Sequence, residues 1–302
     1  MALAVFAYIS MVLFIGITAY KARKLAQLPL HGRMELYPVP GEKGRHEYGG
    51  SYYEEAEWWK KPRELSKGTE LKEMLKEMLF IKKLFENQRP LWWLSYALHL
   101  GIYFLAAWSV LIIAGAFTEL AGLPVKAGAA AGTSLWAVLL YYLGIFTGVV
   151  GFALAAFGSG ALFLRRVFDG TLKKYTTPQE YFNLLLVFAA VVSGLTVWGS
   201  DPTFGNARSV MAHVLSLTSF AAGPLLVLHV ILVGVMFIYI PLSKMSHYVG
   251  KYFTFHKVLW ENEPNVAGSE MEHKVKQALG YRPQNAWSAP HVKAAGAPAP
   301  EK

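Results

Sequence analysis

The sequence contains no cysteine among its 302 residues. Disulfide scaffolds, thiolate zinc sites, iron–sulfur clusters and covalently attached c-type haem all need cysteine, so this chain holds none of them. Charged residues are also few, at 16% against about 25% in soluble globular proteins, whereas hydrophobic residues make up 54%. This composition points to a membrane protein, and any redox cofactor in the chain must be bound non-covalently.

Five stretches are long and apolar enough to cross a bilayer, which needs about 20 helical residues. None has Asp, Glu, Lys or Arg in its interior, and the cations that follow the first stretch argue for a retained helix over a signal peptide. Segment 207–223 is broken at Gly223-Pro224, which predicts a short helix on the outer surface. The five predicted spans are 2–20, 91–117, 133–164, 181–200 and 224–243.

Lysine and arginine are distributed unevenly between the segments that connect the spans. Segments 21–90, 165–180 and the tail from 241 hold all of them except Lys126 and Arg208. The positive-inside rule then places the N-terminus outside and the C-terminus in the cytoplasm. The predicted fold is an all-α five-transmembrane-helix bundle in the cytoplasmic membrane. The net charge of +9 follows from this topology, so we expect no nucleic-acid partner.

The predicted organisation has four parts: helix 1–20, a cytoplasmic segment 21–90, a four-helix region 91–247 and a cytoplasmic tail 248–302. Within the second part, 69–86 has the pattern of an amphipathic helix, with Leu71, Met74, Leu75, Met78 and Leu79 on one face. That face fits the lipid surface or a cytoplasmic subunit, and both interpretations stay open. Beyond about 268 the tail is of low complexity, which predicts a flexible or partner-bound segment.

Four of the nine histidines lie in or beside the predicted spans: His99, His229, His247 and His213. An ionisable side chain within a span is costly and is a functional candidate by default. Neutral imidazole is a preferred axial ligand of haem iron. The competing interpretation is a histidine that forms a hydrogen bond between helices, which is common in bundles.

The spacing of the histidines favours haem ligands. His229 and His247 are 18 residues apart, or five helical turns, so a continuous helix would point both the same way at a separation of about 27 Å. Pro241, between them, would kink such a helix. His99 lies in the inner half of the second span and is predicted to face His247, and facing histidines are how a bundle holds haem b.

These residues resemble a known family. His229 followed by PLSKMSH, which ends at His247, resembles the fifth helix of the haem b subunit of respiratory nitrate reductase, its gamma subunit. Residues 251–265 (KYFTFHKVLWENEPN) are similar to the DsrM-type cytochrome b of the sulfite-reduction-associated Dsr complex and of related heterodisulfide-reductase-like complexes. The resemblance is specific over about 224–265 and weaker over the second span, and segment 21–90 departs from the nitrate reductase pattern.

The resemblance implies that His99 and His247 ligate an inner haem b and that His229 ligates an outer one. The nitrate-type subunit has a second histidine ten residues after the first in its second span, and this chain has Ser109 there. The outer haem therefore lacks an obvious second ligand, and the chain holds two haems or one. Three roles stay open for His213: haem ligand, contact to a quinone, or surface residue.

By this resemblance the chain is an electron-transfer subunit of a quinol-oxidising complex. Electrons would pass from menaquinol at the outer side to a cytoplasmic iron–sulfur subunit of heterodisulfide-reductase type, and the partners would extend to further membrane and outer cytochrome c subunits. The alternative is a haem-free membrane anchor with hydrogen-bonded histidines. A transporter would need charged residues within the spans or an internal repeat, and the sequence has neither.

Overall fold

The computed structural model describes residues 1–28, 67–128, 134–260 and 265–280, and every regular element in these ranges is a helix. Five helices are long and apolar enough to cross a membrane, which confirms the five predicted spans. The described part of the chain is therefore all-helical, and its five long apolar helices are those of a multi-pass membrane protein. The five helices are α1 (Ala2–Ala26), α4 (Arg89–Leu120), α5 (Leu135–Phe168), α7 (Pro178–Ser200) and α9 (Pro224–Leu242).

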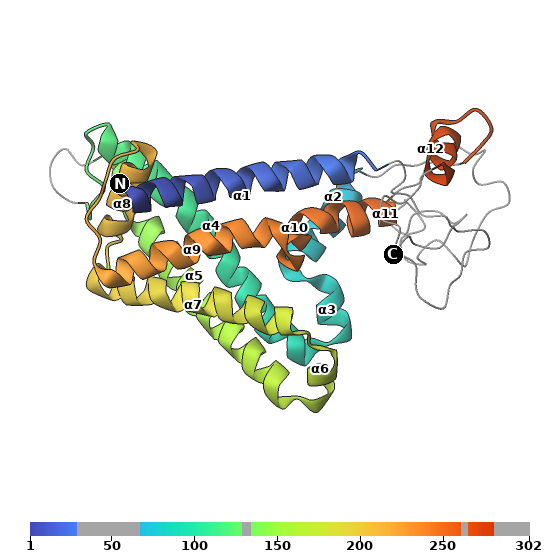
Figure 1. Ribbon diagram of the computed structural model, residues 1–302, viewed down its shortest axis with the longest axis horizontal. Coiled ribbons are helices and arrows are strands. Elements are labelled where there is room, and N and C mark those ends of the chain that lie inside the picture. Colours follow the sequence, from blue (N-terminus) through green and yellow to red (C-terminus); the bar gives the residue numbers. More distant parts are fainter. Residues whose placement is uncertain (29–66, 129–133, 261–264, 281–302) are drawn as a thin grey trace, which may run out of the picture. The chain divides into compact units, whose positions relative to one another are not determined.

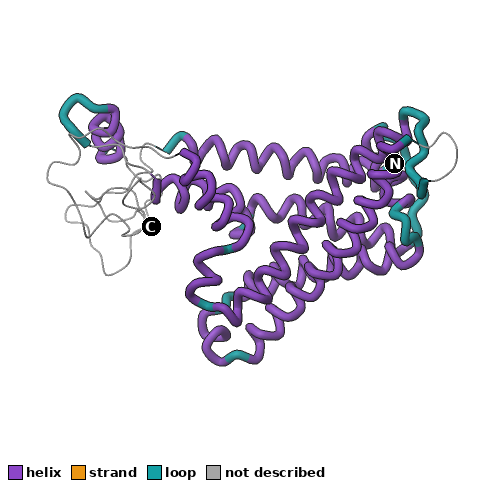
Figure 2. Tube along the Cα trace, turned by 180° about the vertical axis from the view of Figure 1, so that it is seen from behind, coloured by secondary structure: helices purple, strands orange, loops and turns teal. Residues whose placement is uncertain are grey.

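The chain divides into two units, which are described separately. The first comprises Met1–Ala26 and Ser66–His256 and contains all five long helices. Within it α4 packs against α5, α5 against α7, α7 against α9 and α9 against α1 (Figure 1). The N-terminus and the short helix α8 (Gly205–Leu215) lie at one end of this unit, here called the α8 end. Figure 2 shows the same bundle from behind.

Glycines allow α4 and α5 to approach almost to backbone contact. A Cβ atom on Gly101 would lie 2.4 Å from the backbone nitrogen of Ala155, and one on Gly158 would lie 2.4 Å from that of Leu98. Small residues at such crossings are typical of helix packing in membranes, where close van der Waals contact replaces the hydrophobic effect. This contact fixes the part of α4 that carries His99.

The helix predicted over 69–86 is two helices, so that prediction was wrong in its extent. α2 (Lys67–Phe80) and α3 (Lys82–Asn87) are separated by Ile81, whose φ of 52° is unfavourable for a β-branched residue. The acidic side of α2 faces the bundle, because Glu77 contacts Lys251 at 2.5 Å and Glu70 contacts His256 at 3.2 Å. Its large apolar side chains are exposed: Leu71, Leu75, Met78, Leu79 and Phe80.

The helix does not continue from His229 to His247, so the condition for placing both residues on one face is not met. α9 ends at Leu242, one residue after Pro241, and Ser243 has extended backbone angles. The Ser243 hydroxyl then accepts a hydrogen bond from the Met245 N–H and caps a short 3₁₀ turn, η2 (Lys244–Ser246). α10 (His247–Lys251) follows, and a single π-helical turn, η3 (Tyr252–His256), completes this unit. The same-face argument from a five-turn spacing therefore does not hold.

Two other predicted segments differ in the structure. α8 ends at Leu215, well before Gly223, because Leu217 has a φ of 53° and the chain continues without helix. In the second unit, α11 (Lys257–Trp260) and α12 (Glu270–Leu279) are helical, and α12 lies within the tail predicted from about 268 to be flexible or partner-bound. The Ser269 hydroxyl caps α12 by accepting from the Glu272 N–H. Residues 281–302, which carry the rest of that prediction, lie outside the described residues.

Candidate functional site: a histidine pair and a separate cavity

The structure brings two of the predicted histidines together. His99 on α4 and His247 at the start of α10 have ring centroids 6.1 Å apart, with an angle of 64° between the ring planes. His99 and His247 therefore lie close together, as predicted. The break in the helix after Leu242 places His247 there. We call His99 and His247 the histidine pair.

In both imidazoles of the pair, Nδ1 forms a hydrogen bond with a backbone carbonyl oxygen and Nε2 does not. The Nδ1 atom of His99 lies 2.7 Å from the Ser95 carbonyl oxygen, and that of His247 lies 3.3 Å from the Lys244 carbonyl oxygen. A carbonyl only accepts, so these bonds require the proton on Nδ1 and leave the Nε2 lone pair available. Metal-ligating histidines characteristically make this second hydrogen bond, because it fixes the tautomer and the ring orientation.

The separation of the rings suits a shared metal. Two imidazoles on opposite sides of one metal ion, with nitrogens about 2.0–2.1 Å from it and ring centres roughly 1.1 Å further, would have centroids about 6.3 Å apart. The observed 6.1 Å is close to that value. A haem iron takes only its axial ligands from the protein, so a pair of histidines is a sufficient donor set. The residues present therefore fit a bis-histidine haem.

α2 connects the two helices that carry the histidine pair. The hydroxyl of Tyr103, whose ring centroid is 6.5 Å from that of His99, donates to the Met78 carbonyl oxygen of α2 at 2.5 Å. On the other side Lys251 of α10 contacts Glu77 of α2 at 2.5 Å. These two contacts hold α4 and α10 in their relative positions around the pair.

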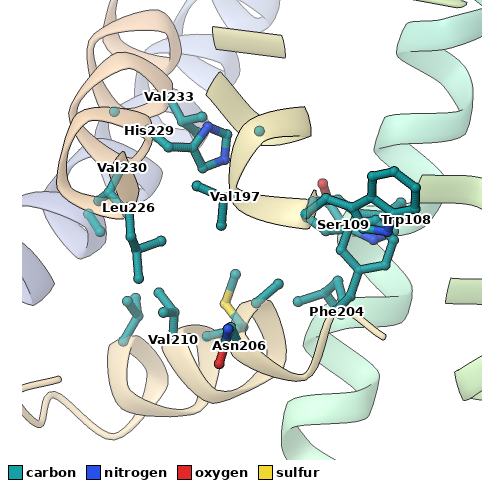
Figure 3. Close-up of a pocket in the computed structure, with 18 of the residues that line it drawn as sticks. Trp108, Ser109, Val197, Phe204, Asn206, Val210, Leu226, His229, Val230 and Val233 are labelled. Atoms are coloured by element: carbon teal, nitrogen blue, oxygen red, sulfur yellow. The ribbon is translucent and has the colours of Figure 1, made fainter. Parts of the chain in front are cut away.

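His229 lies apart from the pair and lines a cavity of about 250 Å³ near the α8 end. Its Nδ1 atom is 3.0 Å from the Ser193 hydroxyl on α7. Figure 3 shows His229 on one side of the cavity, with Trp108 and Ser109 of α4 and Phe204 on the opposite side. We call this space the His229 cavity. The position where the resemblance expects a second ligand thus lines the same cavity as His229, but it carries a serine.

His213 is not among the residues that line the His229 cavity. Its Nδ1 atom is 2.8 Å from the Thr218 hydroxyl, and its ring lies 6.2 Å from that of Phe220. Of the three roles left open for His213, neither the ligand role nor the quinone contact has support from this placement. Among the described residues, the cavity brings His229 together with no second histidine.

Trp108 is a candidate that the sequence pattern did not reveal. It lines the His229 cavity, and its buried Nε1–H has no hydrogen-bond partner among the described residues. Native proteins satisfy most buried polar groups, so such an atom calls for an explanation. A tryptophan within an apolar span gives no sequence signal for this, because the unpaired donor results from how the neighbouring helices pack.

Polar contacts hold α8 against the end of the His229 cavity. Burial tends to raise the pKa of Asp201, but hydrogen bonds from Thr203 and Asn206 outweigh it, so the pKa lies below its usual value. The buried Arg208 of α8 forms an ion pair with Glu119 of α4 at 2.9 Å and donates to the Val125 carbonyl oxygen at 3.0 Å. Arg208 was expected only as a cation of an outer loop. In the structure it links α8 to α4 and to the segment that follows α4.

Comparison with known proteins identifies no family. A scan against protein-family models, a search of curated proteins and a search of solved structures each gave no match. Within the described residues there is also no cluster of three or more His, Asp or Glu side chains able to hold a metal ion.

Proposed function

We propose that this chain is the haem b-binding, quinone-reactive membrane subunit of a respiratory redox complex. It transfers electrons between menaquinol at the outer side and a cytoplasmic iron–sulfur subunit of heterodisulfide-reductase type. The observation that carries the proposal is the histidine pair, with centroids 6.1 Å apart and both Nε2 atoms available.

His99 and His247 are the residues that would hold the haem through their Nε2 atoms. Bound haem would supply one-electron transfer within the membrane. The Ser95 and Lys244 carbonyl oxygens orient the two imidazoles and keep them in the Nδ1–H form. His256 differs, because its Nε2 atom contacts Glu70 at 3.2 Å and is engaged. The pair is thus distinguished from a nearby histidine by which nitrogen it leaves open.

The substrate, the partner and the sidedness rest on the sequence. The excess of Lys and Arg on alternate segments supports an N-terminus outside and a cytoplasmic C-terminus. The resemblance over about 224–265 supports menaquinol as the electron donor and an iron–sulfur protein as the acceptor. An iron–sulfur acceptor would have to be held by another chain, since a chain without cysteine cannot ligate an iron–sulfur cluster through thiolates.

The test is a dithionite-reduced minus oxidised visible spectrum of His99→Ala and His247→Ala chains in membranes. Each change should abolish the same b-type band, because either one removes an axial ligand of the same iron. His213→Ala is the matched control, since His213 is a histidine of the same unit that belongs neither to the histidine pair nor to the lining of the His229 cavity. It should keep the full band.

Chain abundance in the membrane, measured by immunoblot, separates loss of haem from loss of protein. Removal of different haem signals by His99→Ala and His247→Ala would show that the two residues do not share an iron. Full retention of the band in both variants would leave the haem-free membrane anchor as the function.

A further inference from the structure

The break after Leu242 separates His247 from the long helix that precedes it. Ser243 has extended backbone angles and so interrupts the helical hydrogen bonds between α9 and α10. A metal ligand must be held to within about 0.5 Å, by packing and by hydrogen bonds from the residues around it. Because the backbone does not continue as a helix from α9 to His247, contacts from another element must hold this residue in place.

The first helix, α1, extends along both sides of the break. It packs against α9 and also contacts α10 (Figure 1). The contact with α9 is close, because a Cβ atom on Gly234 would collide with the ring of Phe6. The ring of Phe14 stacks on Phe237 of α9 at 5.2 Å and on Tyr248 of α10 at 6.3 Å. α1 therefore links the two helices across the break.

Two hydrogen bonds from α1 hold the residues on either side of His247. The Nζ atom of Lys21 donates to the Ser246 hydroxyl at 2.8 Å. The hydroxyls of Thr18 and Tyr248 are 2.6 Å apart. Thr18 and Lys21 are spaced i, i+3 on α1 and so lie on one face of the helix. One face of α1 thus contacts the residue before His247 and the residue after it.

The bond from Lys21 leads to the group that orients the imidazole. The Ser246 hydroxyl donates its one proton to the Ser243 carbonyl oxygen at 2.8 Å, so it accepts from Lys21. Ser246 ends the turn η2, and the Lys244 carbonyl oxygen at the start of that turn receives the Nδ1–H of His247 at 3.3 Å. A shift of Ser246 would move this acceptor and with it the imidazole.

Lys21 differs from the other cations at the end of α1. Arg23 and Lys24 are exposed and form no hydrogen bond or ion pair with the described residues. That is the expected state of cations that only mark the cytoplasmic side of a span. Lys21 is half-buried and has a directed bond to Ser246, which the sidedness of the chain does not require.

We propose that α1 positions His247 as a metal ligand, with Lys21 and Thr18 as positioning residues that act through Ser246 and Tyr248. The proposal rests on the proposed function for the identity of the metal, which is the haem iron. It assigns a function to a span that the sequence presented only as a retained helix.

The experiment compares variants of the full chain in lipid nanodiscs by ferric EPR and by the rate of haem transfer to excess apomyoglobin. The EPR spectrum of a bis-histidine haem depends on the angle between the imidazole planes, so Lys21→Met should shift its g values. Haem loss should be roughly 10-fold faster, the low end for residues that orient metal ligands. Lys21→Arg keeps a donor and should restore both. Lys24→Met, which removes an equal charge one turn away, is the matched control and should equal the wild type.

Ser246→Ala tests the same bond from the acceptor side. It should shift the spectrum as Lys21→Met does. Adding Lys21→Met to it should cause no further change, because the acceptor of the Lys21 bond is already gone. A further shift in the double variant would show that Lys21 acts by another route and would contradict the proposal.

Hydrogen exchange of peptides from 243–251 gives a readout that needs no haem, and it should be faster in Lys21→Met than in Lys24→Met. Identical spectra and rates of haem loss in these two variants would overturn the proposal, whether both match the wild type or both differ from it. A wild-type chain without haem would refute the proposed function. The exchange rates then decide on α1, because equal rates in the two variants would overturn its positioning of this segment and faster exchange in Lys21→Met would uphold it.

Discussion

The histidine pair and His229, the single histidine at the α8 end, differ in the side chains that lie opposite their imidazole rings. In the pair, each available Nε2 belongs to a ring 6.1 Å from the other ring. The His229 cavity is lined mostly by apolar side chains, with Trp108 and Ser109 of α4 among them and no second histidine among the described residues. The three imidazoles are oriented in the same way, because the Nδ1 atom of each forms a hydrogen bond with an oxygen of the chain.

The difference shows that the hydrogen bond at Nδ1, which fixes the tautomer of a histidine, does not define its function. A fixed tautomer suits a metal ligand and a hydrogen-bond acceptor equally. What separates the two sites is the residue opposite, which is His247 for His99 and the Trp108–Ser109 wall for His229. Four predictions use this comparison, from the largest expected effect to the smallest.

Ser109→His should convert the cavity into a second histidine pair. The substitution places an imidazole in the cavity that His229 lines, so the haem content should rise from about one to about two per chain. Pyridine haemochrome analysis of the purified chain gives the count. The double variant Ser109→His/His229→Ala should return it to about one. An unchanged count in a folded Ser109→His chain would mean that more than the missing ligand separates the two sites.

Arg208→Met should destabilise the α8 end strongly. The change leaves Glu119 without its cation and removes the donor to the Val125 carbonyl oxygen. Breaking a buried ion pair by removing one partner costs about 3–5 kcal/mol. The measurement is the free energy of unfolding in detergent, with the exposed Lys126→Met as control. Similar stability of the two variants would show that α8 is held by other contacts.

Gly158→Ala should separate α4 from α5 near the histidine pair. The added Cβ would lie 2.4 Å from the Leu98 backbone nitrogen, so the helices must move apart. Overpacking of this kind costs about 1–3 kcal/mol. Gly16→Ala is the control, because no atom lies within 4 Å of its added Cβ. A Gly158→Ala chain with wild-type stability and an unaltered haem spectrum would contradict the close contact.

Glu73→Gln should have the smallest effect, and that effect should depend on pH. Hydrogen bonds from Lys76 and then Lys82 lower the pKa of Glu73 from 4.5 to about 2. A lowered carboxyl pKa stabilises the fold above the ordinary value, and the contribution is lost as pH falls from about 5 to about 2. The lysines are partly exposed, so the expected loss is below about 1 kcal/mol at neutral pH.

Thermal unfolding of wild type and Glu73→Gln between pH 2 and 7 measures this difference. The two curves should converge towards pH 2, where Glu73 is protonated and the pair is lost. Glu86→Gln, whose carboxylate is more exposed at 43%, should differ less from the wild type at every pH. A gap between Glu73→Gln and wild type that widens on acidification would have the wrong sign for this account.

The sequence predicted the spans well and the breaks poorly. Five apolar runs of sufficient length are a strong signal, and all five are helices. The break after Leu242 was foreshadowed by Pro241, but only the extended backbone at Ser243 shows where the helix ends. The break at Ile81 had no signal, since a β-branched residue with positive φ contradicts local preference. The helix α12 did have a sequence signal, because Ser269 and Glu272 have the spacing of a helix N-cap.

The histidines of the candidate site could be predicted from the sequence, but the side chains that surround each of them could not. A histidine in an apolar span is conspicuous, so His99 and His229 could be selected by residue type. That Ser109 lines the cavity with His229 follows from how α4 and α9 lie in the bundle. The unpaired N–H of Trp108 depends on burial and on the absence of an acceptor nearby among the described residues, which no sequence pattern expresses.

The central claim is that the chain has one haem site, the histidine pair, and that His229 lines a separate cavity. The most direct measurement is the number of b-type haems per wild-type chain, from pyridine haemochrome analysis against quantitative amino-acid analysis. The account predicts about one haem per chain. A value near two would place a haem at His229, and the absence of haem from an assembled complex would contradict the assignment of the pair.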